Sequence, residues 1–188
     1  HAVYGCDVQQ AVLDDAIADG AIDGTGTMTD STYDMIILCL HQRIAIQMVQ
    51  EALPKIPTGT ILVDTCGLKG RMVRDLTYRC RKAGVRYVGT HPMAGREKNG
   101  YYASISNLFQ NANLIVTPVD GTDEAALDTV KELADQMGFG KIVTATPMWH
   151  DNMIAYTSQL AHVVSSSYVK DFCMDDALSF SGGSFHDM

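Results

Sequence analysis

A histidine follows a short apolar segment in residues 88–100, whose sequence is VGTHPMAGREKNG. An imidazole has an unperturbed pKa of ~6.5, so the side chain of His91 is suited to accept a proton near neutral pH as a general base. The segment before it is a predicted strand, and the end of a strand is a common place for a ligand-facing residue. From these residues alone, a histidine held in a tight turn before Pro92 fits equally well.

A second group of polar side chains lies on one predicted helix, from residue 147 to about residue 170. At 100° per residue, Asp151, Ser158 and His162 fall within one stripe, so Ser158 and His162 can face a common pocket. His150 lies about 120° from His162, so the two histidines do not form a metal pair. We expect His150 to organise the helix start or the domain junction. The alternative for His162 is a buried histidine bonded to Ser158.

Alternating strands and helices must position these side chains. The expected strands are residues 2–6, 35–40, 60–65, 85–89, 113–117 and 141–145. The expected helices are residues 8–19, 42–53, 70–83 and 122–137 and the one from 147. This alternation predicts an α/β fold with a doubly wound parallel sheet over residues 1–145. Residues 146–188 are expected to begin a second, helical domain.

An acidic residue, Asp7, ends the strand predicted for residues 2–6. Ligands of such sheets lie outside the carboxyl ends of the strands, and an acid there can accept hydrogen bonds from a ribose and disfavour the 2′-phosphate of NADP. The alternative for Asp7 is a turn residue. Residues 24–30, GTGTMTD, follow a helix and precede a strand, so we interpret them as a connection rather than a phosphate-binding loop. We expect the true glycine loop and first strand to precede His1.

Composition narrows the class of protein further. With 46% hydrophobic and 19% charged residues, the chain of 188 residues is typical of a folded protein. The net charge of −8 argues against nucleic acid or an anionic membrane as a partner. The longest apolar run, residues 35–40, is too short to cross a bilayer. The five cysteines have neither a paired nor a zinc-binding spacing, which predicts reduced thiols, no metal site and a cytoplasmic protein.

Three segments together resemble the prephenate dehydrogenase family of tyrosine biosynthesis. They are residues 63–70 (VDTCGLKG), 88–100 (VGTHPMAGREKNG) and 150–164 (HDNMIAYTSQLAHVV), in the family's order and spacing. The resemblance implies a Rossmann-type domain followed by a helical domain that forms a homodimer. It also implies NAD-dependent oxidative decarboxylation of prephenate to 4-hydroxyphenylpyruvate, in which hydride moves to nicotinamide and a base takes the hydroxyl proton.

The resemblance also implies roles for individual residues. His91 becomes the catalytic base, and His162 and Ser158 become groups that orient the substrate. Independently of the resemblance, Asp64 and Thr65 are assigned to the cofactor because they lie at the carboxyl end of a predicted strand.

Gly67 departs from the family, because many relatives have a serine there that bonds to the catalytic histidine. We assign Gly67 to the substrate pocket. Because glycine has no side chain to bond to His91, the partner of His91 must be Thr65, Thr90, a backbone group or water.

Prephenate is a dianion, so cations must face it. Arg96 and Lys98 are the candidates within the chain, and a solvated loop is the alternative reading of both. Lys69 matches a lysine of the family, but its role stays open. Residues 182–188 resemble the stretch before an arginine that grips the ring carboxylate in the family.

Two other functions stay open at this point. An arogenate dehydrogenase performs the same chemistry on the amino analogue of prephenate. A non-catalytic NAD-binding or dimerising regulator could use the same scaffold, although the presence of His91, Ser158 and His162 together argues against it.

Overall fold

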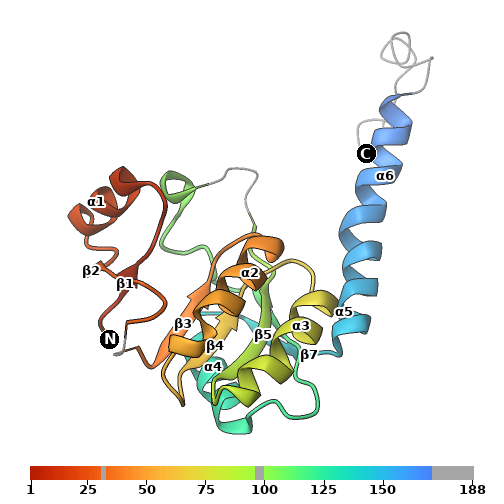
Figure 1. Ribbon diagram of the computed structural model, residues 1–188. Coiled ribbons are helices and arrows are strands. Elements are labelled where there is room, and N and C mark those ends of the chain that lie inside the picture. The colour runs from red at the N-terminus through yellow and green to blue at the C-terminus, as the bar shows by residue number, and fades with distance from the viewer. Residues whose placement is uncertain (31–32, 96–99, 171–188) are drawn as a thin grey trace. The chain divides into compact units, whose positions relative to one another are not determined.

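The protein is described by a computed structural model, which covers residues 1–30, 33–95 and 100–170 (Figure 1). The chain forms two compact units, His1–His150 and a second unit that begins at Asp151. Each is described by itself below. The division that we expect after residue 145 stays a prediction.

A five-stranded sheet forms the centre of the first unit. Its strands are β3 (Met35–Leu38), β4 (Ile61–Asp64), β5 (Arg86–Pro92), β6 (Asn113–Val116) and β7 (Lys141–Thr144), hydrogen-bonded in this order. The pairs β3–β4, β4–β5 and β6–β7 are parallel, whereas β5 and β6 are antiparallel. Three helices accompany the sheet, α2 (Gln42–Ala52), α3 (Gly70–Lys82) and α4 (Glu124–Gln136).

Helices cover both faces of this sheet (Figure 1). Alternate residues of β4 point to opposite faces. Leu62 packs in a core with the buried side chains of α2 and α3, whereas Ile61 and Val63 pack in a second core with those of α4. All four residues of β4 are buried, as expected for a strand between two helical layers.

One pair of strands departs from the predicted parallel order, since β5 and β6 run antiparallel. Parallel neighbours need a crossover connection, usually a helix. The described part of residues 93–112 contains only the short 3₁₀ segment η2 (Tyr101–Ala103), so the chain returns in the opposite direction. The pairing with β6 extends β5 to Pro92, and His91 lies opposite Ile115. His91 therefore lies inside the strand. The sequence had predicted that the strand ends at residue 89, before His91.

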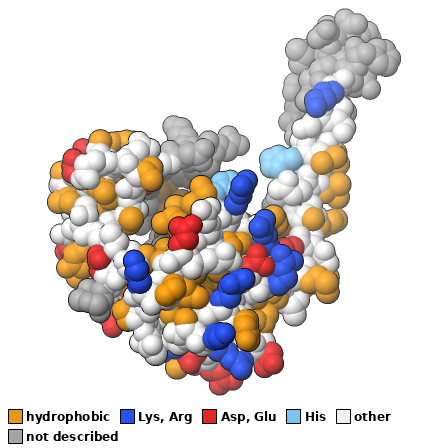
Figure 2. Space-filling view, in the orientation of Figure 1, with side chains coloured by type: hydrophobic (Ala, Val, Ile, Leu, Met, Phe, Trp, Pro, Cys, Tyr) orange, Lys and Arg blue, Asp and Glu red, His pale blue; other side chains and the backbone are white. Residues whose placement is uncertain are grey.

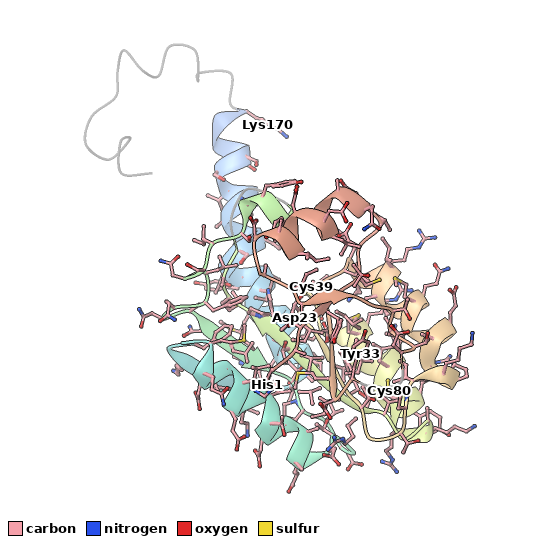
Figure 3. All side chains as sticks on the ribbon, turned by 90° about the vertical axis from the view of Figure 1, so that its left-hand side faces the viewer. His1, Asp23, Tyr33, Cys39, Cys80 and Lys170 are labelled. Carbon is pink, nitrogen blue, oxygen red and sulfur yellow. The ribbon has the colours of Figure 1, made fainter. Side chains whose placement is uncertain are left out.

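A smaller sheet contains β1 (Tyr4–Gly5) and β2 (Gly24–Thr25), which pair in parallel around α1 (Gln10–Ala18). Our interpretation of residues 24–30 as a connection is wrong for Gly24–Thr25, since a two-residue strand is too short to produce a periodic pattern. Side chains outside the strands also stabilise this region. The Asp23 carboxylate accepts a hydrogen bond from the Val3 amide, and the Tyr33 ring lies 5.6 Å from that of Tyr4. Asp23 and Tyr33 are labelled in Figure 3.

Helix α3 packs on the sheet through one apolar stripe and exposes a basic face. Its buried residues Met72, Leu76 and Cys80 are spaced by four. Lys and Arg side chains gather over α3 (Figure 2), and three of them, in its last turn, complement the helix dipole. The chain turns away at Gly84, whose φ of 75° favours glycine.

The helix predicted from residue 147 is not a uniform α-helix. It consists of α5 (Pro147–Ile154), a π-helical segment η3 (Ala155–Gln159) and α6 (Leu160–Val169). The hydroxyl of Thr157 donates to the carbonyl of Met153 at 2.8 Å, so a side chain supplies a partner for a carbonyl next to the π turn. Across the described residues, no helix is both long and apolar enough for a membrane span.

Candidate active site

Two imidazoles meet where β5 ends and α5 begins. Nδ1 of His91 lies 2.8 Å from Nε2 of His150, and the ring planes are inclined at 66°. His150 is only 1% exposed, and its backbone N–H donates to the carbonyl of Thr146 in the first turn of α5. His91 is partly exposed. The fold thus joins residues that are 59 positions apart in the sequence.

The opposite edge of the His91 ring faces the loop after β4. A Cβ atom placed on Gly67 would lie 3.8 Å from Nε2 of His91 and 3.9 Å from Cε1, which is ordinary van der Waals contact. A serine at Gly67 could therefore reach this nitrogen, in agreement with the position of the serine in the family. One nitrogen of His91 contacts His150, and the other borders the carboxyl end of the sheet, where a substrate proton can be accepted.

A buried ionic network fixes the strand that carries His91. Lys69 and Asp64 form a salt bridge and both side chains are 0% exposed. Lys69 also donates to the carbonyl of Thr90, the residue before His91. The Thr90 hydroxyl donates to the Asp64 carbonyl at 2.6 Å, and the Tyr87 hydroxyl donates to the Asp64 carboxylate at 2.6 Å. The loop after β4 and the end of β5 are therefore held together.

Two other ionisable groups around this network stay neutral near pH 7. Burial raises the pKa of Tyr87 well above its usual value, and the neighbouring Asp64 carboxylate adds to the shift. Burial raises the pKa of the Cys66 thiol to about 12, and Asp64 again acts in the same direction. A thiol with this pKa has little thiolate at neutral pH, so Cys66 is not an activated nucleophile.

Asp64, which we assigned to the cofactor from the sequence, ends β4 and is buried. Its carboxylate accepts hydrogen bonds from Lys69, from Tyr87 and from the Cys66 amide, and none of its surface is exposed. A carboxylate bonded in this way stabilises the loop, and its contact with a cofactor stays a prediction. The Thr65 hydroxyl, at the next position, donates to the Leu38 carbonyl at 3.2 Å, and its contact with a cofactor stays a prediction.

Asp7 is exposed just after β1. One carboxylate oxygen accepts a hydrogen bond from the Gln9 amide at 2.8 Å, which is the turn role that the sequence left open. The exposed carboxylate can still accept hydrogen bonds from a ligand at the carboxyl end of the strand.

The remaining predicted site residues are either in the second unit or outside the described residues. Ser158 lies in η3 and is partly exposed, and His162 lies in the first turn of α6 and is exposed. The π segment contains Ser158 and lies between Asp151 and His162, so the stripe expected for a uniform α-helix does not continue across it. Arg96 and Lys98 lie outside the residues that the structure describes. The roles of all four site residues stay predictions.

Two residues near the site were missed or left without a role. For His150 we expected a role at the helix start or the domain junction, whereas its ring contacts His91 on a distant strand. Lys69 carries a charge, which usually indicates a surface residue, and only its spacing of five from Asp64 hinted at a local pair. Thr65 and Thr90, which we considered as partners of His91, use their hydroxyls on backbone carbonyls instead.

Solved structures support the same fold. Prephenate dehydrogenase from Aquifex aeolicus, in complex with hydroxyphenyl propionate and NAD⁺, matches 96% of this chain and 62% of its own with a TM-score of 0.78 and 27% identity. Synechocystis arogenate dehydrogenase matches all of this chain and 69% of its own with a TM-score of 0.82, and its 22% identity supports the fold alone. The predicted Rossmann-type α/β fold is thus confirmed.

Sequence comparison identifies the family to which the chain is related. Cyclohexadienyl dehydrogenase of Zymomonas mobilis is 30% identical over 162 residues, which are 82% of this chain and 54% of that protein. Prephenate dehydrogenase of Bacillus subtilis is 30% identical over 133 residues, which are 68% of this chain and 36% of that protein. The chain thus spans about half the length of the first relative and about a third of the second. The family model for the nucleotide-binding domain of prephenate dehydrogenase matches residues 1–144, and the chain belongs to this family.

Proposed function

We propose that the protein catalyses the NAD-dependent oxidative decarboxylation of prephenate to 4-hydroxyphenylpyruvate. The single observation that carries the proposal is the His91 imidazole, which lies at the carboxyl end of the sheet with Nδ1 against a buried histidine and Nε2 toward the loop after β4. A base in that position suits the oxidation of an alcohol. The relative from Aquifex aeolicus with a hydroxyphenyl acid and NAD⁺ supports both the substrate class and the cofactor.

The residues present fit NAD as the cofactor. Asp7 is an exposed carboxylate that follows β1, where it would accept hydrogen bonds from the adenosine ribose. The same charge would repel the 2′-phosphate of NADP. Thr65, at the end of β4, is our second proposed contact. When bound, NAD supplies the two-electron oxidant of the reaction.

His91 removes the proton of the substrate hydroxyl. Prephenate has a hydroxyl group and a hydrogen on one ring carbon, and oxidation of that carbon requires a base for the hydroxyl proton. A neutral imidazole accepts this proton on Nε2. The ring carboxylate leaves as CO₂, its bonding electrons complete the aromatic ring, and the ring oxygen, left as a phenolate, takes back a proton to become the phenol. Restored aromaticity drives the reaction.

Substrate orientation falls, in this proposal, to four polar or charged residues and one glycine. We assign His162 and Ser158 to hydrogen bonds with the substrate and Gly67 to the wall of its pocket. Arg96 and Lys98 are our candidates for holding the charge of the dianion. A net charge of −8 means that such local cations must act against the overall field of the protein.

We further propose a cytoplasmic homodimer that is built through the segment after Thr146. Three apolar side chains of the final helix are exposed, Leu160 at 47%, Val163 at 61% and Val164 at 59%. Exposed apolar groups gathered on one helix favour a self-complementary interface. The free thiols of the described cysteines fit a reducing compartment.

The test is NADH formation by the full-length protein with NAD and either prephenate or arogenate. Our proposal predicts NADH with prephenate at a higher kcat/KM than with arogenate. A clear preference for arogenate would show that the protein is an arogenate dehydrogenase instead. Binding of NAD without turnover of either substrate would instead support a non-catalytic regulator, provided that a characterised prephenate dehydrogenase is active in the same assay.

A further inference from the structure

The buried histidine beside His91 has no assigned part in the reaction. Nε2 of His150 and Nδ1 of His91 are 2.8 Å apart, which is hydrogen-bond distance, so one of the two nitrogens carries a proton and the other accepts it. The direction of this bond decides which nitrogen of His91 is basic. A neutral imidazole has one N–H and one lone pair, so fixing the proton at one nitrogen exposes the lone pair at the other.

We propose that His150 is a positioning residue that accepts the Nδ1–H of His91 and so fixes this imidazole in the tautomer whose Nε2 is the base. The inference rests on the function proposed above. His150 must then be neutral, with its own proton on Nδ1. When Nε2 of His91 takes the substrate hydroxyl proton, the Nδ1–H bond to His150 stays in place and the lone pair of His150 faces the new positive charge.

Three features of the structure support this direction. The Nε2 edge of His91 faces Gly67 and the carboxyl end of β4, which is the side of the sheet where ligands of such folds lie. The hydroxyls of Thr65 and Thr90 donate to the carbonyls of Leu38 and Asp64, whereas Nε2 of His150 lies 2.8 Å from Nδ1 of His91. His150 is 1% exposed, and a buried partner holds one geometry better than an exposed one.

His150 also offers a replacement for the serine that many relatives have at the position of Gly67. A serine hydroxyl there would reach the Nε2 edge, because a Cβ on Gly67 would lie 3.8 Å from that nitrogen. This chain has no side chain at that position, whereas the contact of His91 with His150 through Nδ1 is present. The glycine adds no side-chain atom beside the Nε2 edge, and His150 orients the ring from the Nδ1 side.

The direct test is ¹⁵N NMR of the histidine ring nitrogens in the full-length protein without cofactor, at neutral pH. The His91 signals are assigned by their loss in His91→Asn. The proposal predicts that Nδ1 of His91 carries the proton and that Nε2 has the chemical shift of an unprotonated nitrogen. A His91 ring protonated on Nε2 and not on Nδ1 would overturn it, and this result does not depend on the folding of any His150 variant.

The kinetic test compares two variants of equal side-chain length. His150→Gln keeps an oxygen that can accept the Nδ1–H of His91, whereas His150→Met keeps the bulk but has no strong acceptor. We expect kcat to fall for His150→Met by roughly 10–100-fold, as when a partner that orients a histidine ligand is removed. KM should change less than 3-fold, roughly, since uniform binding is retained, and His150→Gln should recover most of the lost kcat.

Equal losses in the two variants, or no loss in either, would contradict the positioning role. Circular dichroism and thermal melting establish that both variants are folded before they are compared. The two proposals can fail separately. A wild-type protein that oxidises neither prephenate nor arogenate refutes the proposed function, while the ring-nitrogen spectrum still decides the direction of the His91–His150 bond.

Discussion

Removal of the buried ammonium of Lys69 should destabilise the first unit strongly. Lys69→Met keeps most of the volume of the side chain but leaves the Asp64 carboxylate buried without its cation. Removing one partner of a buried ion pair costs about 3–5 kcal/mol. Since Asp64 keeps its hydrogen bonds from Tyr87 and from the Cys66 amide, we expect the lower end of this range, ~3 kcal/mol.

The loss can be measured by urea and thermal unfolding. For a domain of this size, 1 kcal/mol lowers Tm by roughly 2–4 °C, so Lys69→Met should melt about 6–12 °C below the wild type. Arg71→Met is the matched control on the same helix, because the Arg71 side chain is 55% exposed and pairs with Asp75 at 3.4 Å. An exposed pair of this kind is worth ~0–1 kcal/mol.

The double variant Asp64→Asn with Lys69→Met separates the buried charge from other effects. It removes both charges and should be more stable than Lys69→Met alone, because no unpaired carboxylate remains inside the protein. If Lys69→Met costs no more than Arg71→Met, the buried pair does not hold the loop after β4 to the end of β5. The structural basis that we give for the position of His91 would then be wrong.

Three further predictions concern the cofactor, the assembly and alkaline pH. NAD should bind more tightly than NADP, and Asp7→Ala should reduce the difference between the two Kd values. Tighter binding of NADP by the wild type would show that Asp7 does not repel the 2′-phosphate. The full-length protein should sediment as a dimer at micromolar concentration, and a monomer there would refute the interface that we propose. The free energy of unfolding should fall above pH 9, because burial raises the pKa of Cys66 and of Cys80 to about 12 and only the unfolded thiols then lose protons. Denaturant titrations should show a decrease of up to ~1.4 kcal/mol per pH unit for each thiol, and Cys80→Ala should reduce the slope.

The order of helices and strands in the first unit could be predicted from local patterns. Apolar runs such as residues 35–40 and 60–65 correspond to β3 and β4, and spaced apolar residues followed by glycine correspond to helices such as α3. The direction of β6 could not be predicted, because it depends on the lack of a crossover helix between β5 and β6. The π segment depends on a local competition for carbonyls that hydrophobic spacing does not reveal.

The site was predictable only where a motif marked it. His91 was found because a histidine beside a proline at a strand end is unusual, and the family resemblance then gave it a role. His150 was visible in the sequence, but its contact with His91 depends on how β5 and α5 come together. Asp64 was read as a ligand-facing residue because it ends a strand, whereas Lys69 and Tyr87 bind its carboxylate in the interior. The partners of these side chains thus depend on contacts between distant elements, which local sequence patterns do not reveal.

Turnover of prephenate by His91→Asn tests the central claim most directly. General bases contribute about 10²–10⁴-fold to the rate, so kcat with NAD and prephenate should fall by about this factor while KM changes less. In the wild type, kcat/KM should decrease toward acid pH, because a protonated imidazole cannot accept the hydroxyl proton, and this decrease should be absent from the residual activity of the variant. A variant that keeps near-normal kcat and the same acid limb would show that another group is the base.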